Sequence, residues 1–193
     1  GGFATGALTD GAWMSRETGF AHGFTSFDDS GGGLAALVPR ALSWLRALGS
    51  APGFLFLHAY DVHCPYPTRE PYDSAFCADH GAHVDLADKC GKGALFELEL
   101  SEADRAALVD HYDGGIASAD AWLGELFQGL RAAGLYERAL IVVTSDHGES
   151  LGEPYRGVTR WQQHRGAQVD APRTAGHRAR KHQRRGVVAI LRM

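Results

Sequence analysis

Two uninterrupted apolar runs constrain the fold of this chain more than any other feature. The first is FLFLHAY (54–60), which follows Pro52-Gly53, and the second is LIVVT (140–144). Runs of this length without alternation are typical of strands that are buried on both faces of a parallel sheet. Helical spacing precedes each run, over residues 34–48 and 101–133. Two successive helix–strand units predict an α/β fold with a largely parallel sheet.

The longer helical pattern is bounded by recognisable end signals. Ser101 precedes it, Asp104 stands where a capping box usually has Glu, and Gly134 follows as the stop. The pair Gly114-Gly115 weakens the middle by about 1 kcal/mol per residue relative to Ala. A kink or two shorter helices are therefore alternatives to one helix. In the shorter pattern, Pro39 is expected in the first helical turn.

Glycine and proline predict irregular structure around the first helix–strand unit. Residues 3–10, FATGALTD, can form a short strand and a turn. Residues 17–33, ETGFAHGFTSFDDSGGG, are rich in glycine and aromatic residues and are predicted to form a loop. Three prolines within residues 61–76 predict another loop directly after the first apolar run.

Charge divides the chain near Pro154. Residues 1–153 contain 9 Lys and Arg against 22 Asp and Glu, whereas residues 154–193 contain 10 basic residues and one acid. An acidic body is not expected to bind nucleic acid non-specifically. The basic tail has little apolar periodicity, so it is expected to be disordered or aberrant. A tail that contacts an anionic surface is one interpretation; a frame-shifted end is favoured, because the charge balance changes in the middle of a motif.

The three cysteines do not predict a complete disulfide framework. Cys77 and Cys90 flank a polar stretch and can pair in an oxidising compartment, and Cys64 is the third. His80 and His83 lie between them, but the spacing matches no common zinc pattern. Solvated loop residues are therefore the preferred interpretation of both histidines.

The sequence predicts no membrane span, and its opening does not resemble a signal peptide. No run of 18 apolar residues occurs, so no transmembrane helix is expected. The opening GGFATGALTDGAW has no Met, no basic segment and no apolar segment that would mark a signal peptide. We expect this start to lie within a longer reading frame.

Chemically capable side chains follow both apolar runs. In open α/β sheets, functional groups gather beyond the carboxyl ends of the strands. The carboxylate and imidazole of Asp146 and His147 can bind one divalent cation beside an oxyanion. Other interpretations are that Asp146 caps a helix, that His147 is a surface histidine, and that His63 is a loop residue bound to a backbone carbonyl. The residues that follow the two runs are His58, Tyr60, Asp61 and His63, and Ser145, Asp146, His147 and Glu149.

Several separated motifs, in order, resemble the sulfatase family of the alkaline-phosphatase-like superfamily. They are TGALTDGAWMSRETGFAHGFTSFDD (5–29), FLFLHAYDVHCPYPTREPYDSAF (54–76), YDGGIASADAWLGELFQGLRAAGLYERALIVVTSDHG (112–148) and TSDHGESLGE (144–153). The resemblance implies a mixed, mostly parallel sheet flanked by helices, incomplete here. It also implies a partial catalytic domain over residues 1–153, followed by the tail over 154–193, and metal-dependent hydrolysis of sulfuric esters.

The resemblance also implies roles for three residues. Asp146 and His147 match metal positions of the family, where the ion is usually Ca²⁺. His63, in VHCPY, matches the histidine that hydrogen-bonds the sulfate or its leaving group, and an imidazole there can pass a proton to the leaving oxygen.

Parts of the family pattern do not occur in this sequence. The Cys/Ser-x-Pro-x-Arg motif that supplies a formylglycine nucleophile is missing, and none of the three cysteines fits it. The early metal-binding Asp-Asp pair is not assigned, because Asp28-Asp29 follows a loop. The pattern stops at Pro154, before the C-terminal part of the family domain. We therefore expect an enzyme by family whose fragment is inactive.

Two further functions stay open. One is phosphoester hydrolysis or phosphoryl transfer, because related families use the same scaffold for it. The other is a non-catalytic remnant with a basic tail. The expected partner is a small-molecule or glycan sulfate ester, without a specific nucleic-acid partner. The resemblance allows a periplasmic or extracellular location.

Overall fold

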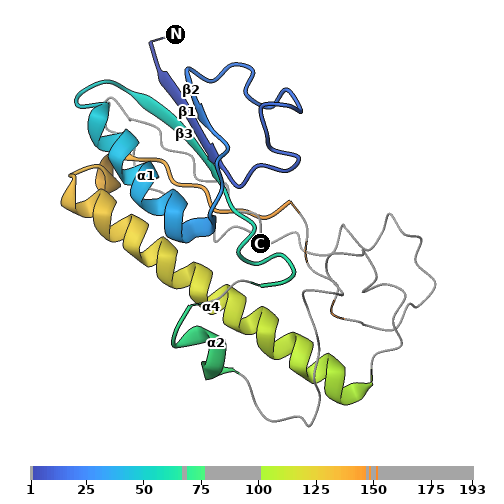
Figure 1. Ribbon diagram of the computed structural model, residues 1–193. Coiled ribbons are helices and arrows are strands. Elements are labelled where there is room, and N and C mark those ends of the chain that lie inside the picture. The colour runs from blue at the N-terminus through green and yellow to red at the C-terminus, as the bar shows by residue number, and fades with distance from the viewer. Residues whose placement is uncertain (1, 67–68, 77–100, 147, 149–150, 152–193) are drawn as a thin grey trace, which may run out of the picture.

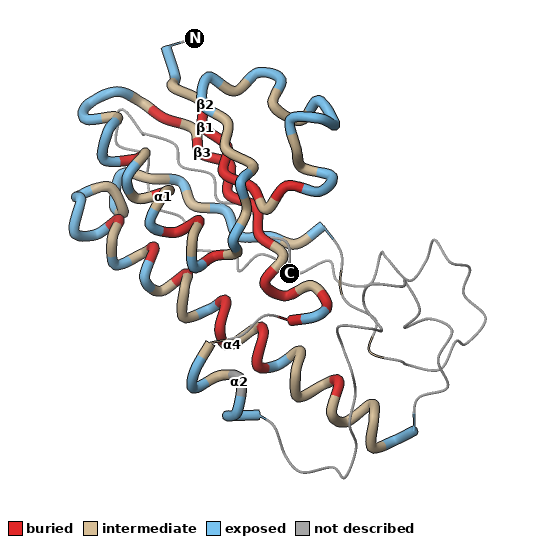
Figure 2. Tube along the Cα trace, in the orientation of Figure 1, coloured by how far each residue is buried: buried red, intermediate tan, exposed pale blue. Residues whose placement is uncertain are grey.

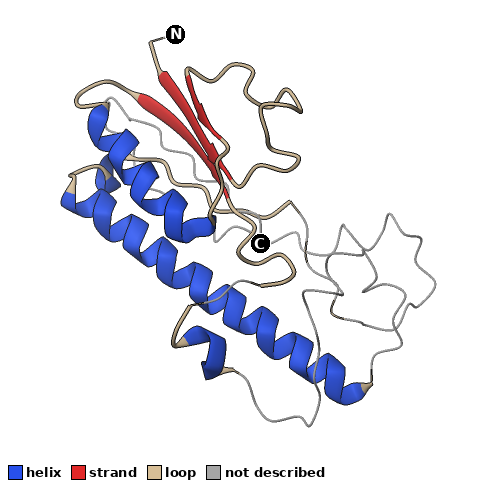
Figure 3. Ribbon diagram, viewed as in Figure 1, coloured by secondary structure: helices blue, strands red, loops and turns tan. Residues whose placement is uncertain are grey.

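Three parallel strands form the sheet of this protein. The computed structural model describes residues 2–66, 69–76, 101–146, 148 and 151. Strand β1 (Ala4–Thr9) lies between β2 (Ser26–Asp28) and β3 (Gly53–His58), so the order is β2-β1-β3. Both pairs are parallel, and all carboxyl ends lie at one edge (Figures 1 and 3). This architecture confirms the expected α/β class.

Helix α1 connects β2 to β3 and lies between the sheet and a second long helix. It spans Gly33–Ala47, and it contacts β1, β3 and α4 (Glu102–Ala132). Two short elements complete the described part, namely α2 (Tyr72–Ala75), which contacts α4, and the 3₁₀ helix η2 (Tyr136–Arg138). Figure 1 shows α1 and α4 running side by side, with their N-terminal ends toward the same side.

The main core lies where α1 meets the sheet and α4. Apolar side chains of α1 recur every three or four residues, which turns one stripe of the helix inward. Figure 2 shows that buried positions gather along the strands and along the facing sides of both helices. The fully or nearly buried members include Leu8, Leu34, Leu37, Val38, Ala41, Leu45, Leu55, Leu57, Leu123, Leu126 and Leu130.

Helix α4 is continuous from Glu102 to Ala132, so the alternative of two shorter helices is wrong. Its N-terminus has the predicted capping box: the Ser101 hydroxyl accepts from the Asp104 N–H, and the Asp104 carboxylate accepts from the Ser101 N–H. Its C-terminus has the predicted Gly134 in a left-handed conformation (φ 65°). The Leu135 N–H donates to the Leu130 carbonyl, as in a Schellman motif.

Three local predictions in the N-terminal half are wrong. Strand β2 lies inside the stretch 17–33 that was expected to be loop, because its backbone pairs with β1. Pro39 lies inside α1 and not in its first turn, since the helix begins at Gly33. Helix α2 forms one turn within residues 61–76, which were expected to be loop throughout.

The predicted strand over residues 140–144 does not join the described sheet. Ala139 and Ile141 pack against the core, whereas Leu140, Val142 and Val143 are exposed. This run is therefore not buried on both faces. A strand needs a neighbour that pairs with its backbone groups, and no described residue pairs with this segment.

The remaining expectations concern cysteines, the membrane and the tail. Cys64 is disulfide-bonded, whereas Cys77 and Cys90, with their predicted pairing, lie outside the described residues. His80, His83 and the tail over 154–193 also lie outside them. Among the described helices, none is both long and apolar enough to cross a membrane.

Candidate active site at the carboxyl edge of the sheet

The carboxyl ends of β1 and β3 bring two chain segments together. The strands are adjacent and parallel, with Thr9 opposite His58. Asp10 follows β1, and its N–H donates to the His58 carbonyl at 3.2 Å. Residues 59–66, which we call the His63 loop, follow β3 at the same edge.

Two carboxylates connect this edge to the N-terminus of α1. Asp10 Oδ1 accepts from the Gly33 N–H at 2.8 Å, and Asp10 Oδ2 accepts from the Tyr60 N–H at 2.9 Å. Asp61 Oδ2 accepts from the Leu34 N–H at 2.9 Å. The first N–H groups of a helix have no partner within the helix and favour negative charge. Carboxylates from two strand ends therefore supply the caps that α1 does not obtain from Gly32.

Asp61 is an unusual carboxyl group because it is only 6% exposed. Burial raises its pKa from 3.8 to about 6; the Leu34 N–H opposes this effect and the charge of Asp10 adds to it. Gly33 permits the close approach of this carboxyl group. A Cβ at Gly33 would lie 3.2 Å from both Asp61 oxygens, and its φ of 64° is unfavourable for other residues.

His63 has one ring nitrogen committed to the protein backbone. Its Nδ1 lies 2.8 Å from the Cys64 carbonyl oxygen, which can only accept, so Nδ1 carries the proton of this bond. Nε2 is then the nitrogen that can exchange a proton with a ligand. The backbone contact was the structural alternative for His63, and it is observed. It fixes the tautomer that a proton-transfer role would use.

A row of aromatic rings leads from β3 to His63. Phe56 stacks on His58, which meets Tyr60 edge-on at 4.7 Å between ring centroids. Tyr60 in turn meets His63 edge-on at 5.5 Å. Residues 56, 58 and 60 alternate in the extended chain, so their side chains share one side of it. The row restrains the imidazole from the side of the strand.

The other side of the His63 loop rests on α4. A Cβ at Gly115 would lie 3.3 Å from the Tyr66 Cβ and 3.4 Å from the Asp61 carbonyl oxygen. The missing side chain therefore lets the loop approach the helix backbone. Within the loop, the His63 N–H donates to the Tyr60 carbonyl, and the Tyr66 N–H donates to the His63 carbonyl, both at 2.9 Å.

Of the two predicted metal ligands, the structure describes Asp146 but not His147. Asp146 is exposed, and it lies in the segment after η2 that forms neither helix nor strand. His147 lies outside the described residues, as does Glu149. The described part of the chain contains no group of three or more His, Cys, Asp or Glu that could hold a metal ion. The meeting of His63 with Asp146 and His147 therefore stays a prediction.

Asp10 is the functional candidate that sequence reasoning missed. The available signal was an acidic residue at the end of an apolar stretch, much as Asp61 and Asp146 follow the two longer apolar runs. Residues 3–10 form a short stretch that contains Gly6, which makes its strand pattern weaker than those of the two longer runs.

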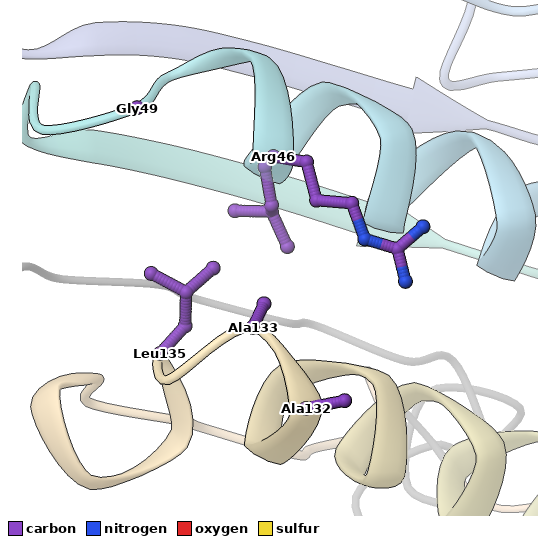
Figure 4. Close-up of a pocket in the computed structure, with 6 residues that line it drawn as sticks. Arg46, Gly49, Ala132, Ala133 and Leu135 are labelled. Atoms are coloured by element: carbon purple, nitrogen blue, oxygen red, sulfur yellow. The ribbon is translucent and has the colours of Figure 1, made fainter.

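A pocket at the far end of the helices has a different character. It has a volume of about 370 Å³ and lies between the C-terminal ends of α1 and α4. Figure 4 shows Arg46 as its charged side chain, beside Ala132, Ala133 and Leu135. Fifteen helical residues separate the two ends of α1 by about 20 Å. The pocket is therefore distinct from the carboxyl edge.

Comparison with known proteins identifies the family. The family model described as Sulfatase matches residues 2–184. The chain belongs to the sulfatase family. This membership agrees with the parallel α/β architecture, and it makes the carboxyl edge of the sheet the candidate active site of a sulfatase-family protein.

One curated relative places this sulfatase-family chain in a wider superfamily. The chain is similar to the multifunctional alkaline phosphatase superfamily protein PehA of Trinickia caryophylli, with 28% identity over 137 residues. The match covers 59% of this chain and 27% of the relative, so the chain spans about a quarter of the relative's length. No solved structure matches the chain significantly.

Proposed function

We propose that this chain is part of a sulfuric ester hydrolase in which His63 gives a proton to the leaving oxygen. Family membership supports the reaction class. The hydrogen bond of His63 Nδ1 to the Cys64 carbonyl supports the role of the residue, because it leaves Nε2 for a ligand. Breaking the S–O bond puts negative charge on the leaving oxygen, and a proton from the imidazolium neutralises that charge. The substrate is a small-molecule or glycan sulfate ester.

Asp146 and His147 are proposed as ligands of a divalent cation, which is Ca²⁺ by resemblance to the family. A bound cation would stabilise negative charge on the ester oxygens. Asp146 suits this ion as one oxygen donor, but Ca²⁺ takes about six to eight oxygens. The described residues do not assemble such a set. We therefore expect Ca²⁺ binding to be weak, and calorimetry that gives a micromolar constant lost in Asp146→Ala would contradict this expectation.

The reaction also needs a nucleophile. The Cys/Ser-x-Pro-x-Arg motif that supplies formylglycine in the family does not occur in these 193 residues. We therefore propose that the chain binds a sulfate ester but does not turn it over alone. Turnover of 4-nitrophenyl sulfate with Ca²⁺ is expected to stay at background. Robust turnover that is abolished by His63→Ala would overturn the proposed inactivity and support His63.

Binding can be tested without turnover. Addition of 4-nitrophenyl sulfate is expected to shift the NMR signals of the His63 ring, with no effect on His22, which is exposed on another loop. The His63→Ala variant should lose the binding, whereas the matched His22→Ala variant should keep it. Ester binding that is unchanged in His63→Ala would refute the assigned role.

Phosphoester hydrolysis is the second candidate. The similarity to a relative named as a multifunctional alkaline phosphatase superfamily protein favours it. The same NMR titration with 4-nitrophenyl phosphate separates the two candidates. A stronger response of His63 to the phosphate ester than to the sulfate ester would favour phosphoester chemistry.

A further inference from the structure

The His63 loop is attached to α1 by two side-chain contacts that span many residues of sequence. Asp10 joins the two segments with one carboxylate, because it accepts from Gly33 at one oxygen and from Tyr60 at the other. Asp61 belongs to the loop itself and accepts from Leu34. Both contacts end on the first N–H groups of α1, so the loop and the start of the helix are held as one unit.

A movement of Asp61 would also move His63, because the two residues are close in the loop. His63 lies two residues further along, and its N–H donates to the carbonyl of Tyr60, the residue before Asp61. The Asp61 carbonyl packs on Gly115 of α4, at 3.4 Å from where a Cβ would be. Asp61 therefore contacts α1 with its side chain and α4 with its backbone, and the imidazole follows directly after it.

We propose that Asp61 is a positioning residue for His63, which holds the His63 loop against α1 when it is neutral and lets the loop open when it is ionised. The role in catalysis rests on the proposed function of His63, whereas the loop movement does not. The geometry carries the proposal: the Asp61 carboxyl group is 6% exposed and accepts a hydrogen bond from the Leu34 N–H, so its ionisation in the closed loop keeps a desolvation cost that exposure to water removes.

The charged surroundings of Asp61 favour the neutral form. Asp10, at the end of β1, is the charged group that acts on it, and its negative charge is repulsive. The first turn of α1 contains no acidic residue, and α4 meets the loop at Gly115, which has no side chain, and through the uncharged Leu108 and Tyr112, which pack on Tyr66. The Leu34 N–H favours the charge but does not outweigh burial.

The direction of the pH effect follows from linkage. Burial raises the pKa of Asp61 from 3.8 to about 6 in the closed loop, whereas an open loop that exposes the carboxyl group restores the ordinary value. Raising the pH through 6 therefore favours opening, and lowering it favours closure.

Amide hydrogen exchange measured by NMR on the full chain tests the proposal. In the wild type, protection of the Leu34, Tyr60 and His63 amides should fall as the pH rises from 5 to 8. Between pH 5 and 8 the fall should be about tenfold for openings that fully expose Asp61, because most of the effect of a pKa raised from 3.8 to about 6 already lies below pH 5. In Asp61→Asn, which keeps an oxygen for the Leu34 N–H but cannot ionise, protection should stay at the high, low-pH value. The Asp120→Asn control, at an exposed position of α4, should behave as the wild type.

The pH at which amide protection is half lost gives a second readout, which a merely structural role of Asp61 would not change. Because Asp10 raises the pKa of Asp61, Asp10→Asn should move the midpoint of the His63 amide to lower pH. This variant also keeps the test decisive if Asp61→Asn does not fold. Protection of the His63 amide that is independent of pH in the wild type, or an unmoved midpoint in Asp10→Asn, would overturn the proposal.

The two proposals fail separately. Exchange that depends on pH without any response of His63 to sulfate or phosphate esters would refute the proposed function alone. An ester response without a pH-dependent loop would refute the positioning role of Asp61 alone.

Discussion

Gly115 and Gly124 form a matched pair that tests how the His63 loop packs on α4. Both lie inside the same helix, so replacement by Ala should gain about 1 kcal/mol from helix propensity at each position. A Cβ at Gly124 would meet nothing within 4 Å, whereas a Cβ at Gly115 would lie 3.3 Å from the Tyr66 Cβ. Such a contact is tighter than ordinary packing, and overpacking costs about 1–3 kcal/mol.

The pair should therefore respond in different directions. Gly124→Ala is expected to raise the free energy of unfolding by about 1 kcal/mol. Gly115→Ala is expected to leave it unchanged or to lower it by up to about 2 kcal/mol, since the packing term opposes the same propensity gain. Urea denaturation at constant pH measures both values, and the slope with denaturant should be the same in all three proteins.

The difference between the variants is the decisive quantity. It should amount to about 1–3 kcal/mol, because the propensity term cancels and only the loop contact remains. Equal stabilisation by both substitutions would refute the close packing of the loop on α4. It would also remove one of the supports that fix His63.

Three further predictions concern charge, strain and capping. Asp61→Asn should raise stability at pH 8 by about 3 kcal/mol and leave it nearly unchanged at pH 4, because a pKa raised from 3.8 to about 6 lowers stability as the pH rises through this window. Thermal melts at both pH values check this, and a variant less stable at pH 8 than the wild type would contradict it. Gly33→Ala should lower the free energy of unfolding by about 1–2 kcal/mol and with it the melting temperature, because the φ of Gly33 is 64° and the new Cβ meets Asp61. A melting temperature at or above that of the wild type would contradict this. Ser101→Ala should cost about 1 kcal/mol by removing the cap of α4, and Ser101→Thr should restore most of it in the same urea titration; equal losses in both would exclude the hydroxyl as the cause.

Asp28 provides a control of opposite sign for the Asp61 prediction. Partial burial would raise its pKa, but hydrogen bonds from Ser30 and Arg40 and the charge of Arg40 lower it overall. A lowered pKa contributes stability above the ordinary value, and this stability is lost as the pH falls. Asp28→Asn should therefore destabilise the protein at neutral pH and not in acid, whereas Asp61→Asn stabilises it above pH 6.

Sequence signals predicted the elements whose causes are local. The capping box at Ser101 and the glycine stop at Gly134 bound α4 because their partners lie within a few residues. The buried strand over residues 54–60 was predicted as a continuous apolar run, and it forms β3 with its end at His58. The sulfatase-family resemblance came from motifs in order along the chain, and the family model confirms it.

Sequence signals failed where the deciding partner lies far along the chain. The run over residues 140–144 has strand propensity, yet no described strand pairs with it. Strand β2 forms in a glycine-rich stretch because β1 supplies its partners. The pair Gly114-Gly115 suggested a weakness in α4, but the helix continues and the absent side chain admits the His63 loop.

The sequence by itself therefore determined the ends of α4, the strand β3, the family and the identity of His63 as a candidate. Only the tertiary structure decided that Asp10 and Asp61 both end on α1, across 23 and 27 residues of sequence. It also decided that Asp61 is buried enough to shift its pKa. The reason is physical: a hydrogen-bonded cap is a property of neighbouring residues, whereas burial and the meeting of charges depend on which distant segments the folded chain brings together.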